Sequence, residues 1–253
     1  MDSCRRFSAF LGLAALAAWA AVATAGTIDP RASDADHVSY GKQFESVCLI
    51  SCRETDSGDK RVASCVIISP RWLVTAAHVV SGSQDGSVEV NGKRIGIDKT
   101  ICHPLYKDES VGFNDVAVCH SEEDMVISFY PPLYSRPDEV GKLASLAGWG
   151  IAGRFDSGAD LADSQRRAGS NIVDGIDRGT ITCTVHEGTA TKLEFLIASG
   201  DSGGGLFLGN ELAGIHSFLS VSGRPPRSKA GETSHHTRIS EVRGWILDTT
   251  GIK

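Results

Sequence analysis

From Val47 onward the chain alternates short apolar, β-branched runs with glycine, aspartate, serine and proline. Each run is short enough for one strand of a half-buried sheet. The runs cover residues 47–50, 63–68, 72–75, 87–90, 94–97, 116–119, 143–147, 181–185, 206–208 and 212–218. Many short strands joined by turns are typical of sandwiches and barrels, so we predict an all-β protein.

Helical periodicity is clear near the C-terminus. Ile239, Val242, Trp245 and Ile246 recur three or four positions apart and therefore share one face of a helix. We predict a C-terminal α-helix over about residues 239–249, following the last strands.

The N-terminal stretch has a different character from the rest of the chain. Arg5 and Arg6 form a short basic start, residues 7–23 are apolar and rich in alanine, and residues 23–25 read Ala-Thr-Ala. Small residues in this spacing are typical of a signal-peptidase site, whereas an uncleaved membrane anchor is the weaker alternative. We predict a signal peptide over residues 1–25 and a mature chain that starts near Gly26. After cleavage the mature chain would no longer be attached to the membrane and would be secreted.

The size and charge of the mature chain limit its partners. About 228 of the 253 residues remain, which suits one large all-β domain. The formal charge of −6 becomes −7 once Asp2, Arg5 and Arg6 are removed, and no basic run occurs. We therefore expect no nucleic-acid partner and no membrane partner after signal removal, and we expect a monomer.

An even number of cysteines remains in this exported chain. They are Cys48, Cys52, Cys65, Cys102, Cys119 and Cys183. An even count in an exported protein predicts up to three disulfides, although their pairing stays open. The competing interpretation is a zinc site, but the spacing typical of paired zinc ligands is missing, so we expect no metal.

Three short motifs carry candidate chemistry. Residues 200–204 read Gly-Asp-Ser-Gly-Gly, residues 75–78 read Thr-Ala-Ala-His, and residues 114–118 read Asn-Asp-Val-Ala-Val. A serine between glycines can be approached closely by a substrate backbone. An imidazole, with an ordinary pKa of about 6.5, can take the serine proton and return it near neutral pH.

In the order His, Asp, Ser, these motifs resemble those of trypsin-like serine proteases. Smaller matches occur at residues 68–74, 103–106, 148–150 and 244–246. The resemblance implies one protease domain over residues 26–253, built as two six-stranded antiparallel β-barrels with the active site between them. The first barrel would cover about residues 45–135 and the second about residues 140–238, followed by the C-terminal helix.

The resemblance also implies the role of each site residue. His78 would act as general base, Asp115 would orient it, and Ser202 would attack the substrate and form an acyl-enzyme. The backbone amides of Gly200 and Ser202 would form the oxyanion hole. We therefore predict a secreted serine endopeptidase that acts on proteins or peptides and needs neither a metal nor an organic cofactor.

Two other classes compete with this interpretation. The Gly-x-Ser-x-Gly pattern at residues 200–204 also matches the nucleophile elbow of α/β-hydrolases. That fold places a helix after the serine and its histidine downstream, whereas residues 203–208 predict glycine followed by a strand. The remaining alternative is a catalytically silent, protease-like binding module.

The residue preference beside the cleaved bond stays open. By the resemblance, Leu196 occupies the pocket floor, where cleavage after Lys or Arg would need a carboxylate. The pocket wall would include Ser217, Phe218 and Leu219, and the bulk of Leu219 favours small apolar side chains. His216, assisted by Ser199, instead resembles the carboxylate-binding histidine of glutamate-specific members.

Activation also departs from the family pattern. Family zymogens are cut before an Ile-Val-Gly-Gly-like segment, whose new amino group pairs with the aspartate before the catalytic serine. That aspartate is present as Asp201, but the segment is missing. Either a different amino terminus reaches Asp201, for which residues 27–29 are one candidate, or another group neutralises it.

Overall fold

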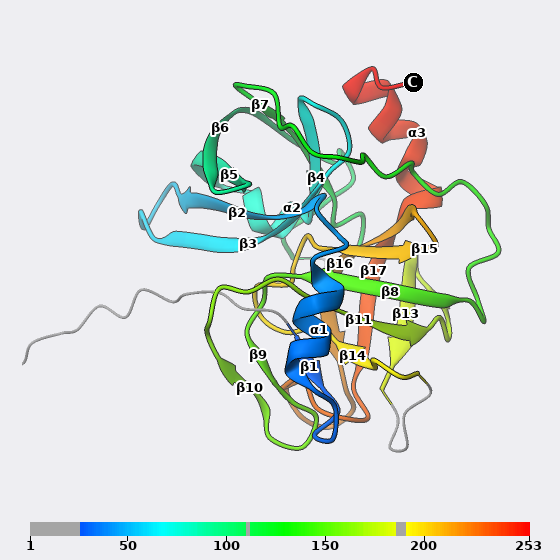
Figure 1. Cartoon of the computed structure of the whole chain (residues 1–253). Coiled ribbons are helices and arrows are strands. Elements are labelled where there is room, and N and C mark those ends of the chain that lie inside the picture. The colour runs from blue at the N-terminus through cyan, green and yellow to red at the C-terminus, as the bar shows by residue number, and fades with distance from the viewer. Residues whose placement is uncertain (1–25, 110–111, 186–190) are drawn as a thin grey trace, which may run out of the picture.

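The computed structural model describes residues 26–109, 112–185 and 191–253 (Figure 1). The predicted signal peptide, residues 1–25, lies outside the described residues. In those three ranges, no helix combines the length and the apolar character needed to cross a bilayer.

The first half of the chain forms a closed barrel. Its strands are β2 (Val47–Glu54), β3 (Lys60–Ile67), β4 (Trp72–Thr75), β5 (Ser83–Val90), β6 (Lys93–Cys102) and β7 (Ala117–Ser121). They follow the order β2-β3-β4-β7-β6-β5, and all neighbours are antiparallel. The apolar positions of the alternating pattern face inward, and Ile50, Leu73, Val88 and Val118 are fully buried.

The second half forms a curled sheet in the order β11-β8-β15-β16-β17-β13-β12. Its strands are β8 (Leu143–Gly148), β11 (Arg167–Ile172), β12 (Gly175–Asp177), β13 (Thr180–Thr184), β15 (Gly205–Leu208), β16 (Glu211–Ser220) and β17 (Thr233–Arg238). Strands β11 and β13 approach each other, so the sheet curls into the second barrel. The predicted all-β, two-barrel fold is confirmed, with the short edge strand β12 as an addition.

A small third sheet includes the first described strand of the chain. Its strands are β1 (Thr27–Ile28), β9 (Ala152–Arg154), β10 (Gly158–Leu161) and β14 (Phe195–Leu196). Strand β1 pairs in parallel with β9 and antiparallel with β14. The start of the described chain is therefore fixed beside the second barrel.

The predicted C-terminal helix is present as α3 (Ile239–Thr250). Its buried residues Ile239, Val242 and Ile246 belong to the same apolar core as the first barrel. Figure 1 shows α3, in red, beside the first barrel, although the preceding strand β17 lies in the second. The end of the chain therefore connects the two halves.

A second helix, α1 (Asp34–Gly41), was not predicted from the sequence and packs beside β11 (Figure 1). The Arg167 side chain of β11 is 1 % exposed and donates to Asp34 at 2.7 Å and to Asp163 at 2.9 Å. A Cβ on Gly41 would come within 2.5 Å of the carbonyl oxygen of Arg166. The buried guanidinium and this close approach hold α1 against the barrel.

We expect Arg167→Ala to lower the free energy of unfolding by about 2–4 kcal/mol. The change leaves two carboxylates without their cation, although both are partly exposed and regain water, which limits the loss. Denaturant unfolding of both proteins measures the difference. Lys93→Ala is the matched control, because Lys93 and its partner Glu123 are both exposed at the surface and the loss of such a pair should change stability little.

The structure corrects the disulfide prediction, because all six described cysteines are free thiols. Cys48 and Cys65 are opposite each other on β2 and β3, but the Cys65 thiol lies 3.5 Å from the carbonyl oxygen of Cys48. The Cys52 thiol donates to the carbonyl of Val79 at 3.3 Å. Cys183 has no second cysteine in its own barrel. Five of these thiols are buried and serve as small apolar residues of the interior, whereas Cys102 is only partly buried.

Candidate active site

His78 and Asp115 are brought together by the pairing of two strands. His78 lies on α2 (Ala77–Val80), a single turn directly after β4, and Asp115 lies just before β7. Strands β4 and β7 are antiparallel neighbours. The His78 ring Nδ1 lies 2.7 Å from one carboxylate oxygen of Asp115, and the His78 backbone amide donates to the other at 2.9 Å. Both carboxylate oxygens therefore hold His78.

Asp115 is buried at the junction of the two barrels. The Ser217 hydroxyl donates to its carboxylate at 2.5 Å, and the Thr237 hydroxyl donates to its backbone carbonyl at 2.9 Å. Burial opposes ionisation of Asp115, but hydrogen bonds from His78 and Ser217 outweigh it and hold the pKa below its ordinary value. The group is therefore ionised at neutral pH.

We expect Ser217→Ala to raise the pKa of Asp115, because the ionised carboxylate loses a donor. A carboxyl with a lowered pKa adds stability above the ordinary value, and this stability is lost as the pH falls through the folded-state pKa. Acid-induced loss of stability should therefore begin at a higher pH in the variant. Unfolding measured between pH 2 and 7 checks this, with Ser220→Ala as the control on the same strand.

Ser202 lies on a tight loop that presses against the first barrel. Gly200 and Gly203 adopt φ of 90° and 83°, which glycine adopts readily. A Cβ on Gly203 would lie 2.1 Å from the hydroxyl of Thr75, at the end of β4. The loop thus faces the turn that carries His78. No hydrogen bond between His78 and Ser202 occurs in the described part of the chain, and such bonds often form only with substrate bound.

Ser64 connects this loop to the first barrel, although no motif in the sequence marks it. Its backbone amide donates to the carbonyl of Ser202 at 2.9 Å, and its hydroxyl donates to the carbonyl of Gly200 at 2.9 Å. The same hydroxyl accepts from the amide of Trp149 at 2.9 Å. Among described groups, the amides of Gly200 and Ser202 have no hydrogen-bond acceptor, so they remain able to bind an oxyanion.

The predicted pocket-floor residue lies in an apolar cluster. Leu196 is fully buried with Phe155 and Val185, and Leu219 and Ala230 pack against them. Ser199 is exposed, three residues before Ser202.

His216 is fully buried in the second barrel. Its ring Nδ1 lies 2.8 Å from Nδ1 of His236, whose other ring nitrogen lies 2.9 Å from the hydroxyl of Ser234. Burial lowers the pKa of His216 to about 3. The ring is therefore neutral and is packed against a second histidine.

Two hollows flank Phe218 beside His78. One, of about 190 Å³, is lined by His78, Tyr106, Asp108, Gly112, Asp115, Ser217 and Phe218. The other, of about 300 Å³, lies across the Phe218 ring and includes Phe113, Arg178 and His235. The rings of Phe218 and His235 are stacked with centroids 4.2 Å apart. These hollows provide room for side chains next to the candidate site.

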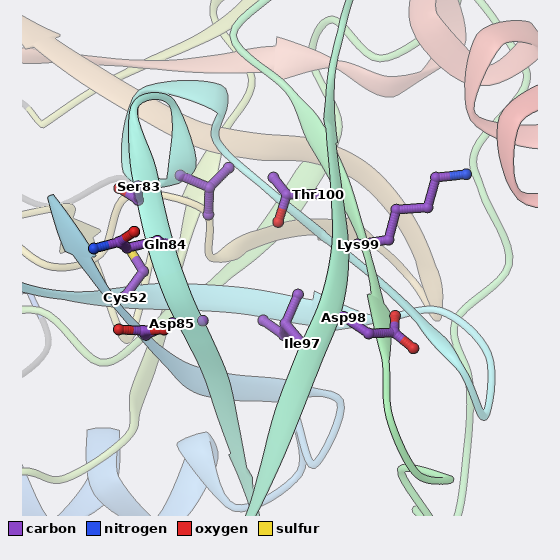
Figure 2. A pocket seen from close by; sticks show the side chains of 10 residues that line it. Cys52, Ser83, Gln84, Asp85, Ile97, Asp98, Lys99 and Thr100 are labelled. Carbon is purple, nitrogen blue, oxygen red and sulfur yellow. The ribbon is translucent and has the colours of Figure 1, made fainter. Parts of the chain in front are cut away.

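A separate hollow of about 260 Å³ opens where β5 and β6 diverge, as Figure 2 shows. It is lined by residues 83–86 and 97–100, with Cys52 of β2 and Val80 of α2. The two strands pair only between residues 87–90 and 93–96, so their other ends separate. Neither His78, Asp115 nor Ser202 lines this hollow, which makes it distinct from the candidate active site.

Comparison with known proteins identifies the family of this chain. The trypsin family model matches residues 41–246, which is most of the sequence. The chain belongs to the trypsin family. It is accordingly a hydrolase of the serine endopeptidase class, and the expected resemblance is confirmed.

Several proteins of the trypsin family are similar to this chain. Brachyurin of Leptuca pugilator is 27% identical over 74% of this chain and 86% of its own length. Serine protease SP24D of Anopheles gambiae is 28% identical over 72% of this chain and 70% of its own length. In fold, the chain is similar to HL collagenase, with a TM-score of 0.67, 21% identity, and coverage of 83% of this chain and 95% of the other.

Proposed function

We propose that this trypsin-family chain is a secreted endopeptidase that uses Ser202 as nucleophile, His78 as general base and Asp115 as the residue that orients His78. The arrangement of His78 and Asp115 carries the proposal. With Nδ1 held at 2.7 Å by a buried, ionised carboxylate, Nε2 is the nitrogen available for the Ser202 proton.

The reaction follows from these positions. The Ser202 hydroxyl adds to the substrate carbonyl carbon while His78 takes its proton, and negative charge develops on the carbonyl oxygen. The amides of Gly200 and Ser202 would donate to that oxygen, and loss of one such donor typically costs about 2.7–4 kcal/mol of barrier. His78 then protonates the leaving amine, and water hydrolyses the acyl-enzyme by the same proton transfers in reverse order.

The hollows beside His78 support binding of an extended peptide. Phe218 lies between them, so two substrate side chains on the acyl side of the bond could occupy opposite faces of its ring. The stacking on His235 fixes the Phe218 ring in place. We assign Ser217 to the wall of the substrate site. Its hydroxyl donates to the carboxylate of Asp115, so it lies between that carboxylate and the hollow.

For the residue before the cleaved bond, a leucine instead of a carboxylate at position 196 and the bulk of the partly buried Leu219 favour a small apolar side chain over a basic one. A preference for acidic side chains would require His216 to reach the substrate, assisted by Ser199. The burial of His216 and its contact with His236 argue against that role. We therefore propose small apolar specificity.

Secretion is part of the proposal, because residues 1–25 have the sequence of a cleavable leader. We assign residues 26–253 to one protease domain, with the first barrel over about residues 45–135 and the second over about residues 140–238. A catalytically silent binding module is disfavoured. A buried carboxylate that orients a half-exposed histidine, as Asp115 orients His78, is a feature of catalytic sites and is not required for binding alone.

Two assays on the mature protein test this function. A fluorophosphonate probe should label Ser202, since labelling requires an activated serine, and Ser202→Ala should remain unlabelled. A peptide library read by mass spectrometry should show cuts after small apolar residues that are lost in Ser202→Ala. A folded protein that neither reacts with the probe nor cuts any peptide would instead identify a binding module.

A further inference from the structure

The turn that carries His78 is too short to be stable by itself. Helix α2 has four residues, and its N-cap is Ala76, whose side chain cannot form a hydrogen bond. The last carbonyl groups of a helix have no partner inside it, so a turn of this length depends on contacts from elsewhere in the molecule. Packing leaves space beside the turn, because Val80 borders the hollow of about 260 Å³ between β5 and β6. The position of His78 therefore depends on the groups that bind the carbonyls of this turn.

Arg61, on strand β3, reaches the end of this turn. One nitrogen of its guanidinium donates to the carbonyl of Ser81 at 3.0 Å and, over the longer distance of 3.4 Å, to the carbonyl of His78 itself. The other terminal nitrogen pairs with the carboxylate of Glu54 on β2. Because the guanidinium is planar, its pairing with Glu54 also orients the nitrogen that faces the turn. Arg61 therefore connects the hairpin of β2 and β3 to the proposed general base.

Two further contacts join the same hairpin to the segment that follows His78. The Cys52 thiol donates to the carbonyl of Val79 at 3.3 Å. The backbone amide of Thr55 donates to the carbonyl of Gly82 at 2.9 Å. A thiol is a weak donor, whereas a charged donor forms a stronger hydrogen bond than a neutral one. Among these contacts, those of Arg61 therefore contribute most to holding the turn.

Both backbone polar groups of His78 are held by side chains. Its amide donates to the carboxylate of Asp115 at 2.9 Å, and its carbonyl accepts from Arg61. The half-exposed ring is held at Nδ1 by the same carboxylate. Without Arg61, Asp115 would still fix the amide side of His78, but the carbonyl side of the turn could shift. The Nε2 atom of the ring would then move relative to Ser202.

Strand β3 supports the proposed nucleophile as well. Ser64, three residues after Arg61, donates to the carbonyls of Gly200 and Ser202. A strand rises by about 3.4 Å per residue, so the two supports lie about 10 Å apart along β3. Proton transfer requires Nε2 of His78 to come within hydrogen-bond distance of the Ser202 hydroxyl. One strand therefore fixes both groups whose relative position determines the rate of the chemical step.

We propose that Arg61 is a positioning residue for His78: its guanidinium holds the carbonyl end of the turn, so that the ring stays aligned with Ser202. Arg61 is not one of the described residues that line the two hollows flanking Phe218. It therefore acts on the chemical step and not on peptide binding. This inference rests on the proposed function, because its effect is seen through His78.

Steady-state peptide hydrolysis by Arg61→Ala tests this role. We expect kcat to fall on the order of 10- to 100-fold with KM nearly unchanged, because a misplaced general base slows the chemistry without altering peptide contacts. The rate of fluorophosphonate labelling should fall as well, since labelling requires an activated serine. Arg53→Ala is the matched control. Arg53 lies on the same hairpin but donates to the carbonyl of Gly58 within it, so its loss should change neither rate.

Two more variants separate this role from a purely structural one. Glu54→Gln removes the charge that pairs with Arg61 but keeps an oxygen that can accept from it, so kcat should be nearly retained even if the free energy of unfolding decreases. Arg61→Lys keeps the positive charge but lacks the planar fork that reaches Ser81 and Glu54 together, so its kcat should lie between those of Arg61→Ala and the unchanged protein. Thermal unfolding of each variant sets a common temperature at which all are folded, and the rates are compared there.

The outcomes are distinguishable. An undiminished kcat in folded Arg61→Ala, or a loss confined to KM, overturns the inference while leaving the protease function intact. If Arg61→Ala does not fold, Arg61→Lys decides: a lower kcat at unchanged KM supports the inference, and an undiminished kcat overturns it. A folded, unchanged protein that neither cuts peptides nor reacts with the probe contradicts the proposed function itself.

Discussion

Ser202→Ala should reduce peptide hydrolysis by about 10⁶-fold and leave the free energy of unfolding nearly unchanged. Removal of the nucleophile in a serine protease typically costs this much in kcat, because the remaining oxyanion donors and binding groups provide only residual catalysis. The fold should persist because the backbone of Ser202 still accepts from Ser64. Peptide turnover and thermal unfolding of the purified variant measure the two effects.

Ser199→Ala is the matched control for that prediction. It removes an exposed hydroxyl three residues earlier on the same loop, and turnover should stay within a few-fold of the unchanged protein. Hydrolysis by Ser202→Ala at an undiminished rate would show that a different residue is the nucleophile.

Asp115→Asn should lower kcat by about 10⁴-fold at neutral pH. The carboxylate now accepts from the His78 ring, the His78 amide and Ser217, and an amide offers one acceptor oxygen in place of two. The ring then loses the partner that keeps Nε2 unprotonated. Steady-state kinetics over pH 6–10 check the loss.

The control for Asp115→Asn is Asp108→Asn. Asp108 lines the same hollow but accepts from Tyr106 and Ser81 and not from His78, so its change should leave kcat nearly intact. A similar loss in both variants would attribute the effect to the charge around the site instead of to the orientation of His78.

The sequence predicted the core strands well, because burial on one side of a strand leaves an alternating pattern. It missed β17, which reads Thr-Ser-His-His-Thr-Arg and has no apolar residue. That strand is nevertheless buried, since His236 pairs with His216 and Ser234 donates to the carbonyl of Cys183. These partners come from β16 and β13, so local composition could not reveal them.

Helix α1 and strand β1 were missed for a related reason. Helix α1 buries only His37 and Gly41, and Arg167 of a distant strand holds its first turn. Strand β1 has two residues and depends on β9 and β14. Their stability comes from tertiary contacts and not from periodicity.

The motifs around His78, Asp115 and Ser202 could be identified because each lies in a short local pattern. The contacts of Asp115 with Ser217 and Thr237 depend on how the barrels meet, and the resemblance placed Ser217 only on the pocket wall. The carboxylate of Asp201 likewise accepts a hydrogen bond from the backbone of Gly26, which is far away in the sequence. The sequence indicated that either an amino terminus, with residues 27–29 as one candidate, or another group would neutralise that carboxylate.

Because of the contacts of Ser64, the geometry of the candidate active site depends on how the two barrels are positioned relative to each other. The loop of Ser202 belongs to the second barrel by its place in the chain, but a residue of the first barrel holds two of its carbonyls. A small slip between the barrels would change the loop before either barrel unfolds. Inactivation on heating would then report the loss of contact between two intact halves, and neither half alone could reproduce the site.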